Sequence, residues 1–414
     1  MASARTAGRR FSPLDEELAL LPGELTPHLQ EQLAHLGAWM PFAPAAAMLQ
    51  RFTQVTVSEA TAQRLTEVVG RAYVAVQQAA VERIEQELPP VPTGPERALL
   101  SVDGAMVPLC GGEWAEVKTL VVGEVGAVGV AELPAPDRGG TPREGHATAL
   151  SYCSRLADVE TFNHAVLGEL HRRGVETAGQ VAAVSDGADW IQGFIDLHCP
   201  QALRILDFPH AAERLARLGQ AVAPGDATWL PTQLHRLKHE GPDGVLADLR
   251  PLVAAHLSAH PDTLMPTEDL AYLDKRVAQM QYPAYQAQGW PIGSGCVESA
   301  NKLVVEARLK GAGMHWARVN VNPLLALRNA VCTDRWEEAW TLSSAYLRHQ
   351  ALPRCPPPPL PFPPAPAALL PPPPAPRPTI PPGPHRPAPT HPWKRPLIPS
   401  KPSSLSSAAS SAKL

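Results

Sequence analysis

The segment 97–210 changes its hydrophobic periodicity in a way that limits the fold to one class. Three strand-like segments come first, at 97–110, 113–125 and 128–133. An alternation of helix and strand patterns follows, at 159–174, 181–187, 189–199 and 202–210. Three consecutive strands followed by alternating helices and strands predict a mixed α/β sheet.

A helical insertion interrupts this predicted α/β unit. Residues 211–285 are almost wholly helical in pattern, and strand and helix signals of the α/β unit resume at 286. The N-terminal region is also helical and ends at the proline-rich stretch 89–95. We therefore predict an N-terminal region, a first core part, an insertion, a last core part and a tail, at 1–95, 96–210, 211–285, 286–350 and 351–414.

The N-terminal region carries a candidate helix-turn-helix over 41–70. Ser58 is placed as the N-cap of its second helix and Gly70 as the C-terminal stop, before a separate helix over 71–88. Thr61 and Arg64 would then face outward, where a helix-turn-helix contacts DNA. Two core helices joined by a turn explain the pattern equally well, because no residue in it is diagnostic.

The C-terminal segment 351–414 has a composition unlike the rest of the chain. It holds 24 of the 48 prolines, which predicts an extended and disordered tail. Residues 352–414 also carry a charge of +7, which leaves −11 for the rest of a chain with a formal net charge of −4. An acidic body does not favour nucleic-acid binding, so DNA contacts would need local basic patches, the tail or metal-neutralised carboxylates.

The cysteine pattern and the hydropathy of the sequence indicate the cellular compartment in which we expect the protein. The six cysteines are scattered without a CxxC pair, which disfavours both a zinc ribbon and a disulfide framework. The sequence has no uninterrupted apolar run of about 18 residues and no apolar signal-peptide segment at its start. We expect a cytoplasmic protein that does not use a membrane.

Three acidic residues stand in contexts typical of catalytic carboxylates. Asp103 and Asp186 each close an apolar strand pattern and precede a glycine, and Glu298 lies one turn into a helix after a glycine-rich bend. Simpler explanations are a hairpin turn, an Asx-turn or N-cap, and a solvated helix face, respectively. Converging carboxylates repel one another unless cations lie between them, so a shared site predicts two divalent metal ions.

A fourth acid and a histidine lie close to this set in the sequence. Asp207 and His210 fall where a predicted strand ends and a helix begins. A lone histidine at such a place is usually structural. Paired at this spacing after Asp186, the two residues would orient a scissile phosphate or its attacking water.

The chain resembles the transposases of the ISKra group of bacterial insertion sequences, which are related to the Mutator-like superfamily. The matching stretches occur in the family's order and cover most of residues 11–349. They are FSPLDEELAL, TPHLQEQLAHLGAWMPFAPAAAML, SVDGAMVPL, SDGADWI, LDFPHAAERL, IGSGCVESANK, RLKGAGMHWA and LRNAVCTDRWEEAW.

The resemblance implies a ribonuclease-H-like catalytic domain with a helical insertion. Carried over by position, Asp103, Asp186 and Glu298 would hold two Mg²⁺ or Mn²⁺ ions, and Asp207 with His210 match the family's Asp-x-x-His signature. The implied activity is metal-dependent cleavage and strand transfer at the terminal inverted repeats of the element and at target DNA. Two element ends require at least two subunits, so we expect a homo-oligomer on DNA.

Several residues are expected to contact that DNA. They are Ser58, Thr61 and Arg64 in the helix-turn-helix, Lys302, Arg308, Lys310 and Arg318 beside Glu298, and Trp316, which would stack on a base near the transposon end. For any single basic residue in this set, a solvated helix surface explains the charge equally well.

Two rival functions follow from the same residues. The family's cysteine-bearing N-terminal segment is not matched and the proline tail is foreign to it, so a catalytically inactive relative that binds DNA, as a repressor does, is one alternative. A ribonuclease-H-like nuclease acting on RNA or on a hybrid duplex is another. Such an enzyme would have to distinguish RNA from DNA through the 2′-hydroxyl.

Overall fold

The computed structural model describes residues 24–126, 145–260 and 265–351. All of them belong to one compact unit, Met1–Arg354. The strand predicted at 128–133 and the tail predicted beyond 351 lie outside the described residues, as does the matching stretch at 11–20. None of the helices in the described ranges is long and apolar enough to cross a membrane.

Five strands form one mixed sheet, as the periodicity predicts. They are β1 (Arg97–Pro108), β2 (Trp114–Val125), β3 (Ala147–Leu156), β4 (Gln180–Ser185) and β5 (Leu203–Leu206). Their order is β3-β2-β1-β4-β5. The pairs β3–β2 and β2–β1 are antiparallel, and the pairs β1–β4 and β4–β5 are parallel. β1 is therefore the central strand, which explains its nearly continuous burial.

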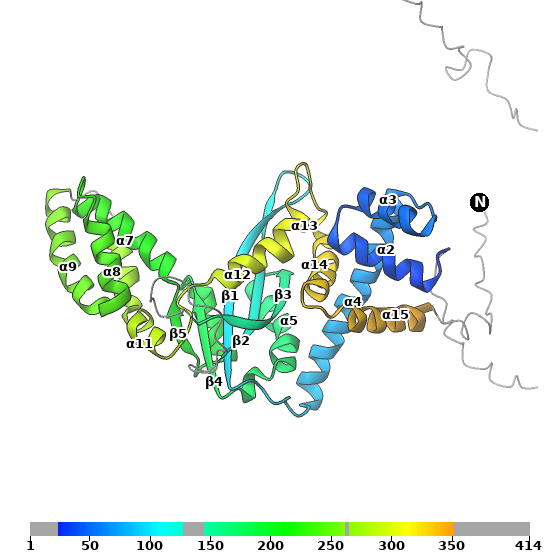
Figure 1. Ribbon diagram of the computed structural model, residues 1–414, viewed down its shortest axis with the longest axis horizontal. Coiled ribbons are helices and arrows are strands. Elements are labelled where there is room, and N and C mark those ends of the chain that lie inside the picture. Colours follow the sequence, from blue (N-terminus) through cyan, green and yellow to red (C-terminus); the bar gives the residue numbers. More distant parts are fainter. Residues whose placement is uncertain (1–23, 127–144, 261–264, 352–414) are drawn as a thin grey trace, which may run out of the picture. The chain divides into compact units, whose positions relative to one another are not determined.

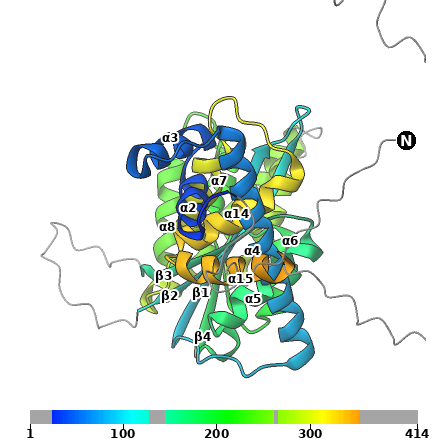
Figure 2. The same ribbon diagram turned by 90° about the vertical axis from the view of Figure 1, so that its right-hand side faces the viewer.

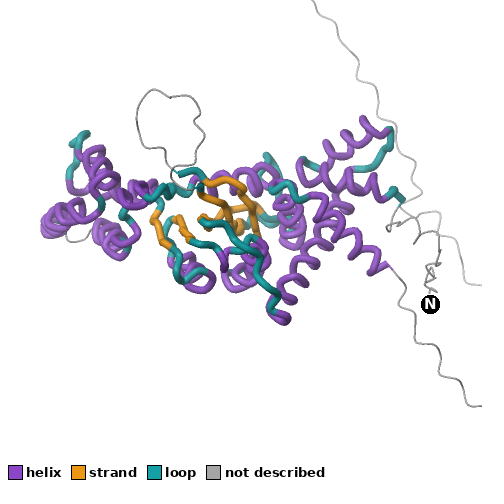
Figure 3. The backbone as a smooth tube through the Cα atoms, turned by 60° about the horizontal axis from the view of Figure 1, so that its bottom comes forward, coloured by secondary structure: helices purple, strands orange, loops and turns teal. Residues whose placement is uncertain are grey.

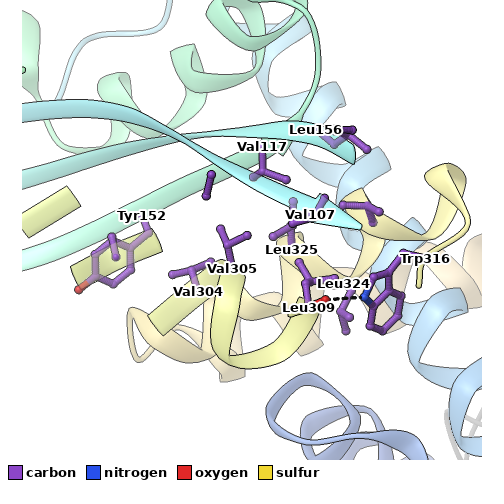
Figure 4. Packing of buried hydrophobic residues seen from close by; sticks show 14 of the residues in the cluster. Val107, Val117, Tyr152, Leu156, Val304, Val305, Leu309, Trp316, Leu324 and Leu325 are labelled. Atoms are coloured by element: carbon purple, nitrogen blue, oxygen red, sulfur yellow. Dashed lines mark hydrogen bonds between the residues drawn. The ribbon is translucent and has the colours of Figure 1, made fainter. Parts of the chain in front are cut away.

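Helices cover both faces of the sheet (Figure 1). On one face, Leu100 and Val102 of β1 pack with residues of α5 (Val159–Arg172) and α6 (Asp189–His198). The alternate residues of β1 point to the opposite face because successive side chains of a strand change sides. There, as Figure 4 shows, Val107 and Val117 pack with Val304, Leu309 and Leu325 from a helical layer. That layer is α12 (Gly295–Ala300), the π-helix η3 (Asn301–Glu306), α13 (Ala307–Leu309) and α14 (Arg318–Cys332).

The edge strand β3 was not predicted, and its pairing groups are satisfied from α14. Asn322 Oδ1 accepts from the backbone N–H of Leu156 at 2.7 Å, and its Nδ2 donates to the Leu156 carbonyl at 3.1 Å. Asn329 Oδ1 accepts from the Ser154 N–H at 3.2 Å. An unpaired strand edge can pair with another chain, and these two asparagines occupy its backbone groups at Ser154 and Leu156.

The N-terminal helices are α2 (Pro27–Trp39), α3 (Phe42–Thr53) and α4 (Glu59–Glu87). They pack with α14 and with α15 (Trp336–Ala351), as Figure 2 shows from their own side. Ser58 is the N-cap of α4, as predicted, with its hydroxyl 3.1 Å from the Thr61 N–H. The predicted stop at Gly70 is wrong, because α4 runs through it as one helix. A Cβ at Gly70 would collide with the Pro323 carbonyl, so this glycine allows α14 to approach closely.

The predicted insertion is helical. Its members are α7 (Phe208–Val222), α8 (Trp229–Glu240), α9 (Pro242–Ala259), α10 (Met265–Lys275), the 3₁₀ turn η2 (Val277–Gln279) and α11 (Tyr282–Ala287). Leucines of α7 and α9 pack with Ile205 and Leu206 of β5 in one apolar cluster. The insertion therefore adjoins the parallel side of the sheet, and Figure 3 shows strands with helices on either side of them.

Candidate active site

Asp103 lies in the middle of the central strand and not at a turn. It pairs with Thr119 of β2, so the simple explanation as a hairpin-turn residue is wrong. The β1–β2 connection comes later, where Gly111 and Gly112 adopt positive φ angles of 94° and 84°. The tight turn is therefore made by Gly111 and Gly112, which tolerate positive φ angles. Asp103 does not take part in the turn and is an acidic residue within the sheet.

Asp186 follows the last residue of β4 and lies level with Asp103. Ser101 of β1 is opposite Val184 of β4, so two residues further along the two parallel strands Asp103 and Asp186 come side by side. Neighbouring strands are about 4.8 Å apart, which brings the two acids together. Asp186 Oδ1 also accepts from the Ala188 N–H at 2.8 Å. The predicted Asx-turn is therefore present, and it leaves the second carboxylate oxygen available.

The electrostatics of Asp103 reflect this neighbour. Burial raises the pKa of Asp103, and the negative charge of Asp186 raises it further. The Gly104 N–H, 2.7 Å from Asp103 Oδ1, and the Asn301 Nδ2, 3.0 Å from Asp103 Oδ2, oppose this rise by donating hydrogen bonds. His210 opposes it too, which places its ring within electrostatic reach of the acid pair.

Asp207 and His210 form the pair that the sequence predicts. Asp207 is completely buried between β5 and α7, and its Oδ2 is 2.5 Å from His210 Nδ1. The hydrogen bond with Asp207 raises the pKa of His210, and the charges of Asp207, Asp186 and Asp103 add to this effect although burial opposes it. The imidazole is half-exposed, so its second ring nitrogen can be reached from solvent.

Glu298 stands on the short helix α12, which connects the two groups of acids. Its carboxylate is exposed and accepts from the Ser294 hydroxyl at 3.3 Å. The backbone N–H of Ser294 donates to Asp207 Oδ1 at 2.7 Å. One turn after Glu298, Asn301 donates to Asp103. The helix is thus anchored to Asp207 at its start and to Asp103 at the π-helical turn that follows, a distortion often found at functional sites.

The arrangement contains acids from four elements but does not close around one point. In the described parts of the chain, no three His, Cys, Asp or Glu side chains are grouped so that they could hold a metal ion. The carboxylates of Asp103, Asp186 and Glu298 are oxygen donors, which hard cations such as Mg²⁺ prefer. These side chains therefore suit such an ion chemically. Glu298 would still have to approach Asp103 and Asp186 to bind the same ion.

The predicted DNA contacts divide into exposed and buried residues. Arg64, Lys302 and Arg318 are exposed. Ser58 and Thr61 cap α4 together, with their hydroxyls 2.9 Å apart. Lys310 is partly buried and forms an ion pair with Glu306 at 2.7 Å.

Arg308 and Trp316 lie in the interior, contrary to the predicted surface placement. Arg308 is 1% exposed, and its Nε donates to the Gly37 carbonyl at 3.0 Å. The indole N–H of Trp316 donates to the Leu309 carbonyl at 2.9 Å, drawn as a dashed line in Figure 4. Neither side chain faces solvent, so both stabilise the helix that follows Glu298 and are left out of the proposed DNA surface.

Four residues of the site had no assigned role in the sequence prediction. Ser294 and Asn301 were visible only as neighbours of Glu298. Tyr272 and Arg276, which bind the backbone beside Asp186, look like ordinary members of an amphipathic helix pattern. Their positions 86 or more residues away from Asp186 give no local signal that would have revealed them.

No protein-family model matches the chain, and no curated protein matches it. The geometry of the acidic residues therefore has to carry the functional proposal.

Proposed function

We propose that this protein is a DNA transposase with a ribonuclease-H-like catalytic core. The observation that carries the proposal is that Asp103 on β1 and Asp186, directly after the parallel strand β4, are neighbours. Asn301, just after the helix of Glu298, donates to Asp103. A mixed sheet in the order β3-β2-β1-β4-β5 with a helical insertion before the last acid is compatible with that core.

The proposed cofactors are two Mg²⁺ or Mn²⁺ ions held by Asp103, Asp186 and Glu298. Such ions supply Lewis-acid activation of an attacking water and charge stabilisation at the leaving 3′ oxygen. Burial and, to a smaller extent, the charge of Asp186 raise the pKa of Asp103, and a bound divalent cation would offset both effects. Glu298 is exposed and held by one hydroxyl, so its side chain can change rotamer to join the pair.

The other residues of the site have orienting roles in the proposal. Asp207 holds His210 through Nδ1, which leaves the opposite nitrogen to donate to a phosphate oxygen of the scissile bond. Asn301 donates to Asp103 Oδ2 and thereby fixes the direction of that carboxylate. Lys302 and Arg318 are exposed cations near this helix layer and would contact the DNA backbone.

A nicking assay tests the proposal. Purified protein should nick duplex DNA that carries the ends of its element when Mg²⁺ or Mn²⁺ is present, and Asp186→Asn should reduce the rate by at least about 10³-fold because it removes one ligand charge. Asp243→Asn is the matched control, since Asp243 is exposed at the first turn of α9. Equal nicking by Asp186→Asn and the control would rule out the site.

A catalytically inactive DNA-binding relative is the second candidate. It is favoured by the lack, among the described residues, of three grouped side chains that could hold a metal. The two candidates differ in a simple way. The inactive relative would bind element-end DNA equally well with and without divalent ions and would never nick it.

A further inference from the structure

The turn that carries Asp186 is held from outside by the helical insertion. The phenol of Tyr272, on α10, donates a hydrogen bond to the Asp186 carbonyl. Arg276, just beyond α10, donates from Nε to the Gly187 carbonyl at 3.1 Å, and its Nη2 donates to the same oxygen. Two successive carbonyls next to the acid are therefore fixed by one helical segment.

The residues that hold the turn belong to a partly buried charged cluster. Arg276 is 5% exposed, and its guanidinium lies 3.8 Å from the centre of the Tyr272 ring. The guanidinium of Arg214 lies 4.3 Å from the same ring and donates to Asp269, which is 1% exposed, at 2.7 Å. Burying the Arg276 guanidinium and the Asp269 carboxylate is costly unless both have well-placed partners, so their contacts favour one arrangement of this cluster.

Gly187 lies between Asp186 and this cluster, in a space that leaves no room for a side chain. Its φ angle is +78°, in the left-handed region that favours glycine. A Cβ at this position would come within 2.5 Å of Arg276 Nε and 2.9 Å of the Tyr272 oxygen. Two separate constraints, one on the backbone and one on space, therefore require glycine directly after Asp186.

The same segment also holds the start of α6. Lys275 pairs with Asp189 at 2.9 Å, and Arg276 Nη2 lies 3.4 Å from the same carboxylate oxygen. The turn between β4 and α6 is thus bound at Asp186, Gly187 and Asp189. Inside it, the Ala188 N–H fixes one oxygen of the Asp186 carboxylate.

We propose that Tyr272 and Arg276 are positioning residues that hold the Asp186 carboxylate beside Asp103, which makes the helical insertion a working part of the catalytic centre. This inference rests on the proposed function of Asp186 as a metal ligand. Groups that orient a metal ligand commonly change metal affinity 10- to 100-fold when they are removed. A small displacement of a reacting group has a comparable effect on rate.

The test uses two tyrosine variants of the full-length protein. Tyr272→Phe removes the hydroxyl and keeps the ring that contacts both guanidinium groups. Tyr285→Phe is the matched control, because its hydroxyl donates to the Ala278 carbonyl at 2.6 Å, away from Asp186. Thermal unfolding is measured first to show that both variants are folded. Mn²⁺ affinity is then measured by the EPR signal of free Mn²⁺, and kcat and KM by nicking of element-end DNA.

Tyr272→Phe should weaken Mn²⁺ binding by about 10-fold or more and lower kcat by a similar factor, with KM for DNA unchanged. Tyr285→Phe should match the wild-type protein in all three quantities. If both variants keep wild-type Mn²⁺ affinity and kcat, or if both lose them equally, the positioning role is overturned while the proposed function stands. If the wild-type protein itself binds no Mn²⁺ and does not nick DNA, the proposed function is overturned, and the positioning role with it.

Discussion

Arg308 and Arg328 are two buried arginines that bond only backbone carbonyls within the described residues. Both are 1% exposed. Arg308 donates to the Gly37 carbonyl, and Arg328 donates to Ala38 at 3.3 Å and to two carbonyls of the π-helix, Val304 at 3.3 Å and Leu303. The last carbonyls of a helix lack partners within it and carry its negative dipole end, so cations are favourable at the end of α2.

The two arginines should contribute very differently to stability. Burial and the charge of Arg328 lower the pKa of Arg308 to about 10, which means that its cation is held at a cost. We expect Arg308→Met to change the free energy of unfolding by less than about 1 kcal/mol, since the lost hydrogen bond is offset by removing that charge. Arg328→Met should lower it by about 3 kcal/mol, because three charge-assisted hydrogen bonds are lost.

Urea denaturation of the two variants at pH 7 measures both values. An equal loss of stability in Arg308→Met and Arg328→Met would contradict this account of the pair.

Single residues also show where sequence reasoning fails. The burial of Arg308 and Trp316 could not be predicted, because an arginine close in sequence to a candidate catalytic acid resembles a DNA contact until its carbonyl partner is known. Ser58 was predictable, since a cap is a local hydrogen bond between residues three apart. Asp207 and His210 were predictable for the same reason, being one helical turn apart.

The long helix α4 packs closely against α14 at Gly70, the glycine that the sequence analysis placed at the end of a helix. Gly70 faces α14 at a point where the Pro323 backbone leaves no room for a methyl group. Glycine costs a helix interior about 1 kcal/mol relative to alanine, so close packing has to outweigh that cost here.

Alanine substitutions should separate these two effects. Gly70→Ala should lower the free energy of unfolding by about 2 kcal/mol despite its better helix propensity, because α14 would have to move. Gly193→Ala in α6 should raise it by about 0.5 to 1 kcal/mol, since a Cβ there meets no atom within 4 Å. Thermal or urea unfolding gives the sign of each change, and a stabilising Gly70→Ala would contradict the packing argument.

At the level of elements, strands with plain apolar patterns were predictable and the edge strand was not. β1 and β4 are central or nearly so and are buried on both faces, which gives them continuous apolar runs. β3 carries the buried polar residues Ser151, Ser154 and Arg155. On its outer edge, the backbone of Leu156 and Ser154 is bound by asparagines of α14, 166 and 175 residues further along the chain. No window of local sequence contains that information.

In the whole molecule, segments that are distant in the sequence bring acidic residues into one region without closing them around a single point. The sheet brings Asp103 and Asp186 together, and Asp207 with His210 lies at the start of α7. The helix of Glu298 is tied to Asp207 through Ser294 and to Asp103 through Asn301. The contexts of Asp103 and Asp186 at the ends of apolar strand patterns predicted that these two acids lie together, and the joining of Glu298 to them stays a prediction. The contacts that set the geometry of this region, from Asn301 and from Tyr272, depend on the complete fold and become visible only with it.

The central claim is that Asp103, Asp186 and Glu298 together hold divalent metal ions against DNA. The most direct measurement is the anomalous scattering of Mn²⁺ in crystals of the protein with element-end DNA. We expect two Mn²⁺ peaks beside Asp103 and Asp186, with a Glu298 oxygen about 2.0–2.3 Å from one of them, the range of hard-cation coordination distances. Crystals with bound DNA and saturating Mn²⁺ that show no peak at these carboxylates, or show Glu298 turned away from it, would contradict the account.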